Sequence, residues 1–143
     1  MIKSKDIAMA IEWSEAYATT IDSIDRQHKK LFEYINKLEN CILEGMYVGS
    51  KIDDILEFLG TYTKVHFSHE EFCMKENGCP TAEKNIKAHE SFLEFYTDFV
   101  KSYKEASADA EKEKLIRRLQ KMAEDWLVNH ICKIDIHLKA CVK

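Results

Sequence analysis

The sequence predicts an all-α protein, an antiparallel up-down-up-down four-helix bundle with an N-terminal arm. Its 143 residues include only 4 Gly and 1 Pro, so few residues would interrupt helices. Charged residues make up 32% of the chain, and many are interleaved with apolar residues at the three- and four-residue spacing of amphipathic helices. With 45% apolar residues the chain can bury one substantial core, and we expect one domain over residues 1–143.

The first elements are an arm and a helix. Residues 1 to about 20 show no clear period, and Trp13 and Tyr17 are expected to anchor them on the domain. A helix is predicted from about 23 to 44, with Ser23 as its N-cap and Gly45 as its stop signal. Its apolar residues recur at three and four positions: Ile24, Leu31, Ile35, Leu38 and Ile42.

Three further helices are predicted, from about 51 to 76, from about 81 to 103, and from about 108–110 to about 140. The second opens after the capping residue Ser50 and ends at the pair Asn77-Gly78. Its expected inward residues are Ile52, Ile55, Leu59, Tyr62, His66, Glu70 and Cys73. Those of the last helix are Leu115, Leu119, Met122, Trp126 and His130. Short connections favour antiparallel neighbours, which gives the bundle.

Charge and composition exclude several classes of partner. The net charge is −4 and basic residues are scattered among acidic ones, so a nucleic-acid partner is not expected. No run resembles a secretory signal or the ~20 apolar residues of a membrane span, which predicts a cytoplasmic protein without a membrane partner. An odd number of cysteines without a CxxC spacing favours reduced thiols: Cys41, Cys73, Cys79, Cys132 and Cys141.

His66 and Glu70 are the first candidate metal ligands. Four residues at about 100° each place them about 40° apart around a helix axis, so both can reach one centre. Such a pair is usually a surface pair, but this one lies on the inward face between Tyr62 and Cys73. An unpaired carboxylate there would carry a desolvation cost of several kcal/mol, so a compensating group is expected.

Each of the other three helices aims one imidazole inward: His28, His89 and His130. A single inward histidine is more often a satisfied core residue, but one from every helix is a much less probable coincidence. Imidazoles and carboxylates that converge within a helical bundle are typical ligands of non-haem iron.

Asp135 is a further candidate, five residues after His130. Five residues correspond to about 140° of rotation, so a regular helix would turn the two side chains apart. We therefore predict a π-bulge within 131–135, or a break in the helix there.

Four segments of the chain resemble the hemerythrin family in order and spacing: IDRQHKKLF, HFSHEEFCM, KAHESF and WLVNHICKID. The resemblance extends from Trp13 to Asp135 and implies a left-turning four-helix bundle that binds dioxygen reversibly without haem. It implies two iron ions, bridged by two carboxylates and an oxo or hydroxo group. By position, His28 and His66 would hold the iron with an open site for dioxygen, and Glu70 and Asp135 would be the bridging carboxylates.

The second iron would take His89 and His130, and here the chain departs from the family. The family supplies a third imidazole four positions before His89, where this chain has Asn85. A carboxamide oxygen is a weaker donor with a shorter reach. Asn85 could bind through oxygen, a water could fill the position, or the iron could be weakly held and partly absent. Another side chain could also substitute, and the candidates are Cys73, His69, Glu83 and Glu90.

The resemblance also implies an apolar dioxygen pocket, which would limit access of water and protons: Phe67, Trp126, Leu127 and Ile131. These residues would equally serve as core packing.

Three functions remain open, with the oligomeric state left undecided. The first is a dioxygen-binding di-iron protein that serves as a carrier, store or sensor and is not an enzyme. The second is a di-iron enzyme that reduces peroxide or nitric oxide at an opened second iron. The third is a binding module for a single metal ion, iron or zinc.

Overall fold

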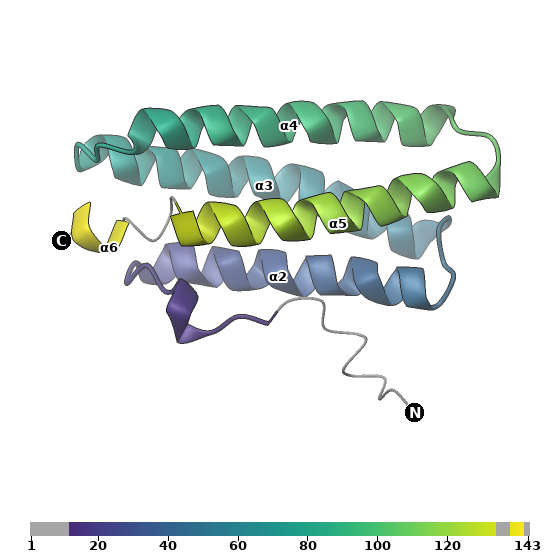
Figure 1. Cartoon of the computed structure of the whole chain (residues 1–143), viewed down its shortest axis with the longest axis horizontal. Helices are drawn as coiled ribbons and strands as arrows, with labels where there is room; N and C mark the ends of the chain where they lie inside the picture. The colour runs from purple at the N-terminus through teal and green to yellow at the C-terminus, as the bar shows by residue number, and fades with distance from the viewer. Residues whose placement is uncertain (1–11, 134–137, 142–143) are drawn as a thin grey trace.

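The structure is a computed structural model, and it describes residues 12–133 and 138–141. Four long helices lie side by side and are labelled in Figure 1: α2 (Asp22–Leu43), α3 (Ser50–Glu76), α4 (Ala82–Glu105) and α5 (Asp109–Lys133). A short 3-10 helix, η1 (Glu15–Tyr17), precedes them, and α6 (Leu138–Cys141) follows. The predicted all-α four-helix bundle is confirmed. No helix within the described ranges is both long enough and apolar enough to cross a membrane.

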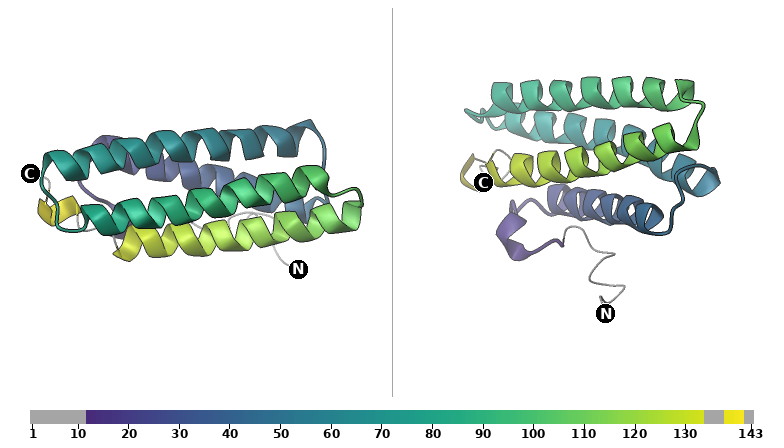
Figure 2. Two further views of the ribbon diagram at one scale, coloured as in Figure 1. Left: turned by 90° about the horizontal axis from the view of Figure 1, so that it is seen from above. Right: turned by 45° about the vertical axis from the view of Figure 1, so that its right-hand side comes forward.

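The four long helices form a closed ring. Helix α2 packs against α3 and α5, and α4 packs against the same two helices from the other side (Figure 2). Each helix therefore directs one face into a shared interior, where side chains from all four can meet.

The interior has two apolar clusters. The larger one runs through all four long helices and includes Leu31, Phe67 and Ile131. The smaller one lies at the end of the bundle that holds the α3–α4 turn, and it is built from Ile24, Met74, Cys79 and Leu138. The buried residues between the clusters are polar, His28 on α2 and Glu70 on α3, so the candidate ligands lie between two apolar layers.

Several predicted helix ends are confirmed and two predicted caps are wrong. Gly45 has a φ of 71°, and the N–H of Met46 donates to the carbonyl of Cys41 at 2.8 Å, so α2 ends as predicted. Neither Ser23 nor Ser50 caps a helix, because both lie inside the first turn, and no side chain caps α2 or α3. Helices α2 and α3 therefore each begin one residue earlier than predicted.

The N-terminal arm packs as expected over its described part. Trp13 and Tyr17 are half-buried against the larger cluster, and the ring of Tyr17 meets Phe32 edge-on with centroids 5.4 Å apart. The ammonium of Lys29 lies 4.3 Å from the centroid of the Trp13 ring. These contacts attach the arm to α2, beside which it lies in Figure 1.

The inward faces of α3 and α5 differ from prediction by one residue in places. Thr63 and Met74 are buried, whereas the predicted Tyr62 and Cys73 are only half-buried. In α5 the residues Ile116 and Ala123 are buried in place of Leu115 and Met122. In α3 the predicted inward residues advance by about 3.5 residues per turn, and the 3.6-residue period of a real helix displaces them over its length.

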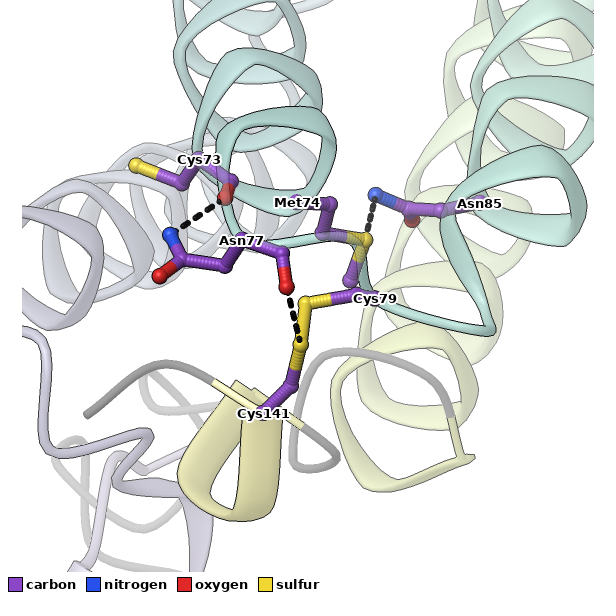
Figure 3. The surroundings of a disulfide bond; sticks show 6 residues. All are labelled: Cys73, Met74, Asn77, Cys79, Asn85 and Cys141. Atoms are coloured by element: carbon purple, nitrogen blue, oxygen red, sulfur yellow. Dashed lines mark hydrogen bonds between the residues drawn. A yellow bond between two sulfur atoms is a disulfide. The ribbon is translucent and has the colours of Figure 1, made fainter.

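Two cysteines correct the prediction of reduced thiols. Cys79 and Cys141 form a disulfide with their Cα atoms 5.6 Å apart, although their sequence separation is 62. It joins α6 to the α3–α4 turn, as Figure 3 shows. Cys41 and Cys73 are free thiols. The pairing was not predictable because it depends on the bundle bringing two distant segments to one end.

Candidate metal centre

Five of the predicted ligands converge inside the bundle. They come from all four long helices, and none is more than 4% exposed: His28, His66, Glu70, His89 and His130. Asp135 lies outside the described residues, so its predicted role stays a prediction. Helix α5 is regular up to Lys133, which leaves no irregularity at 131–133, and the last two residues of the predicted segment 131–135 lie outside the described ranges, so the prediction is untested there.

Glu70 is the centre of this group because each of its carboxylate oxygens faces a different pair of imidazoles. Oε2 lies 3.5 Å from Nε2 of His28 and 3.5 Å from Nε2 of His66. Oε1 lies 3.0 Å from Nε2 of His89 and 3.5 Å from Nε2 of His130. We call these groups the His28 half (His28, His66 and Glu70) and the His89 half (Glu70, His89 and His130). Within each half, one donor atom per residue lies within 4.8 Å of the others.

Burial sets the charge of the site. Burial lowers the pKa of His66 to about 3, because a charged imidazolium would lose its hydration, although Glu70 opposes the shift. Burial alone would raise the pKa of Glu70, but the favourable interaction of its carboxylate with the facing imidazoles of His130, His28 and His89 outweighs burial and holds that pKa well below its usual value. The interior therefore combines an anionic carboxylate with at least one neutral imidazole.

Two residues that the sequence did not single out orient the imidazoles. Nδ1 of His66 donates to Oε1 of Gln27 at 2.8 Å, and Nδ1 of His89 donates to Oε2 of Glu71 at 2.7 Å. Hydrogen bonds of this type fix the tautomer that directs the Nε2 lone pair toward a metal. Gln27 adjoins the predicted ligand His28, but it serves a ligand on another helix, so sequence spacing gave no signal for it.

The donor atoms fit a cation. With its proton on Nδ1, His66 turns a lone pair at Nε2 toward Oε2 of Glu70, and neither atom has a hydrogen bond from a described residue. Nε2 of His89 lies 3.0 Å from Oε1 of Glu70 and 3.0 Å from Nε2 of His130. Two facing acceptors repel each other unless a proton or a metal ion lies between them. Imidazole nitrogen and carboxylate oxygen suit iron, so the residues present fit the metal that the sequence suggests.

Asn85 is fully buried and acts as a hydrogen-bond donor. Its Nδ2 donates to Oε1 of Glu70 at 2.9 Å and to the thioether sulfur of Met74 at 3.2 Å, a contact drawn in Figure 3. Its Oδ1 receives no hydrogen bond from a described residue. The amide thus turns its nitrogen, not its oxygen, toward the bridging position.

The other candidates for the missing donor lie away from the centre. Nε2 of His69 is 2.9 Å from the hydroxyl of Ser23 and 3.9 Å from the sulfur of Cys73. Glu83 and Glu90 are exposed on α4. Among the residues that the structure describes, none of these four joins either half.

A small apolar cavity of about 20 Å³ lies in the larger cluster, next to the candidate ligands. Phe67, Trp126 and Leu127 line it, whereas Ile131 is buried without lining it. The hydroxyl of Thr63, a polar lining residue, is occupied by a hydrogen bond to the carbonyl of Leu59 at 2.7 Å. A cavity of this size has room for about one water-sized molecule, and an apolar lining disfavours water in it.

The cavity lining also packs directly on the imidazoles. The ring of Phe67 stacks on His89 with centroids 3.8 Å apart, and Trp126 stacks on His130 with centroids 4.4 Å apart. These contacts are in the His89 half, whereas the sequence placed the open dioxygen site in the His28 half.

Comparison with known proteins agrees with this arrangement. Residues 19–142 match the family model described as the Hemerythrin HHE cation binding domain. The chain is 30% identical over 125 residues to a bacteriohemerythrin of Clostridium acetobutylicum, which covers 86% of this chain and 94% of the relative. It is 28% identical over 134 residues to a myohemerythrin of Theromyzon tessulatum, covering 94% and 95%. A crystal structure of a hemerythrin mutant superposes with a TM-score of 0.74 at 28% identity, covering 93% and 97% of the two chains.

Proposed function

This chain belongs to the hemerythrin family and is a non-haem iron-binding protein of that type, and we propose from that premise that it binds dioxygen at a pair of iron ions. In this proposal it serves as a carrier, store or sensor of dioxygen. His28 and His66 hold one iron, His89 and His130 hold the other, and Glu70 bridges them. We propose Asp135 as the second bridge.

The observation that carries the proposal is the position of Glu70. One buried carboxylate faces two separate pairs of imidazoles, each pair at its own oxygen. A site for a single ion would need only one of these pairs. Two groups that share one carboxylate are the arrangement expected for a bridged pair of metal ions.

The protein residues have three tasks in this function. Gln27 and Glu71 hold two of the imidazoles in the binding tautomer. Phe67 and Trp126 keep water and protons away from the site and fix the planes of the rings on which they stack. The chemistry that bound iron supplies is reversible donation of electrons to dioxygen, which a dry, apolar surrounding preserves.

Asn85 makes the His89 half the weaker half. Both halves have two imidazoles and one carboxylate oxygen among the described residues. The amide nitrogen of Asn85 donates to Oε1 of Glu70, so the oxygen that the His89 half offers a metal is already engaged, whereas Oε2 in the His28 half receives no hydrogen bond from a described residue. We propose that the iron in the His89 half is held less tightly than the iron in the His28 half.

Metal loading followed by aeration tests the function. The full chain is loaded with Fe(II) without oxygen, the iron per chain is measured, and the visible spectrum is recorded on aeration and again after removal of oxygen. We expect two irons per chain and a charge-transfer band that appears with air and fades without it. Zinc-loaded protein is the control and should show no band.

Other outcomes would favour the other functions. One iron per chain and no visible band would overturn the proposal in favour of a single-metal module. Sustained consumption of peroxide or nitric oxide with an added reductant, without reversible spectral change in air, would indicate an enzyme.

A further inference from the structure

The two halves of the site differ in the side chain that accepts a hydrogen bond from Nδ1 of an imidazole, the ring nitrogen on the side away from Glu70. Nδ1 of His66 donates to a neutral carboxamide, that of Gln27, at 2.8 Å. Nδ1 of His89 donates to a carboxylate, that of Glu71, at 2.7 Å. The half that lacks its third imidazole is therefore the half with an additional negative charge behind a ligand.

The position of Glu71 allows it to carry that charge at low cost. Its side chain is 27% exposed, so the carboxylate keeps part of its hydration, while His89 is 1% exposed. Glu71 follows Glu70 in α3, and successive side chains point about 100° apart around a helix. Glu70 therefore enters the interior, and Glu71 reaches across the rim of the site to α4.

We propose that Glu71 strengthens His89 as a metal ligand and thereby retains a cation in the half that Asn85 leaves short of a donor. A carboxylate that accepts a hydrogen bond from Nδ1–H raises the electron density at Nε2, so Nε2 binds a cation more strongly. Gln27 fixes its imidazole in the same way but adds no charge. The inference rests on the proposed two-iron function and explains how the weaker half keeps its iron.

Substitutions that change the charge of the acceptor side chain but keep its hydrogen bond to the imidazole test this role. Glu71→Gln keeps an acceptor of the same shape, and Gln27→Glu is the matched variant in the other half. Each full chain is loaded with Fe(II) without oxygen, and release of iron to a chelator is followed. We expect Glu71→Gln to weaken binding of one of the two irons by about 10- to 100-fold and to change the Mössbauer signal of that iron alone. Gln27→Glu adds a carboxylate behind His66 and should tighten binding of the other iron.

A double-mutant cycle tests whether Glu71 compensates for Asn85. In an Asn85→His background the missing imidazole is supplied, so Glu71→Gln should cost less than about threefold in affinity. An equal loss in both backgrounds would overturn the compensation.

The remaining outcomes are also decisive. If Glu71→Gln releases both irons together and lowers the melting temperature of the metal-free chain, its role is in folding and the inference is wrong. Unchanged iron affinity in Glu71→Gln, with two irons in the wild type, would overturn this inference and leave the proposed function intact. A wild type that binds no second iron would overturn both.

Discussion

The His28 half and the His89 half use the same carboxylate but are built differently. In the His28 half, the rings of His28 and His66 meet edge-on with centroids 4.7 Å apart. In the His89 half, Phe67 stacks on His89 and Trp126 stacks on His130, at interplanar angles of 7° and 12°. The two halves therefore present similar donors in unequal surroundings.

The difference shows how a bundle can lose a ligand and remain packed. Asn85 is smaller than an imidazole, yet it is fully buried and its amide nitrogen bonds to Glu70 and to Met74. A buried polar group without a partner would cost about 1–3 kcal/mol, and these contacts avoid that cost for the nitrogen. The His89 half thus lacks a third imidazole, but the buried side chain of Asn85 fills the position.

Removal of the shared carboxylate should abolish both halves and has the largest expected effect. Glu70→Ala takes an oxygen donor from each pair of imidazoles, so we expect affinity for both metal ions to fall by at least about 100-fold. Metal content after dialysis measures it. Glu70→Gln keeps the shape without the charge and should also lose metal. Full metal content in Glu70→Ala would show that Glu70 is not the bridge.

Restoration of the third imidazole should strengthen the His89 half. Asn85→His adds a nitrogen donor to the His89 half, so its iron should bind more tightly by on the order of 10- to 100-fold. Oxidation of the iron in air should also become slower. Iron titration and stopped-flow spectroscopy measure the two effects. If neither changes, position 85 does not contribute to the site.

Loss of the disulfide should affect stability more than the site. The bond closes a loop with a sequence separation of 62, so Cys141→Ser should lower the free energy of unfolding of the metal-free chain by about 2–4 kcal/mol. Iron loss should be modest and occur first in the His89 half, because Cys79 packs with Met74, which contacts Asn85.

Thermal unfolding measures this effect, and a thiol reductant supplies its control. Under reducing conditions the wild type and Cys141→Ser should unfold alike, because the bond is then absent from both. A difference that persists in reductant would show that the serine itself, not the missing bond, destabilises the chain.

The smallest effect is expected at Cys73, which the sequence placed on the inward face. The structure leaves it half-buried and outside both halves, next to His69. Cys73→Ser should therefore leave the content and affinity of both metal ions within twofold, as measured by titration. Loss of one metal would mean that this thiol replaces the missing imidazole.

The comparison between sequence and structure separates what is local from what is not. The turn at Gly45 and the inward direction of His28, His66, His89 and His130 followed from residue type and helical period. Met74 and Thr63 were missed, because a one-residue shift of the inner stripe depends on how long helices rotate when they pack. Gln27 was missed because it bonds to a ligand on a different helix.

By itself the sequence determined the class of fold, the four long helices and the identity of the donors aimed inward, because helical period and chain breakers act over a few residues. Only the tertiary structure decided which oxygen of Glu70 faces which imidazole, how Asn85 turns its amide, and that Glu71 supports His89. It also decided the pairing of Cys79 with Cys141. These features depend on the rotation and axial position of packed helices, which no local pattern of residues specifies.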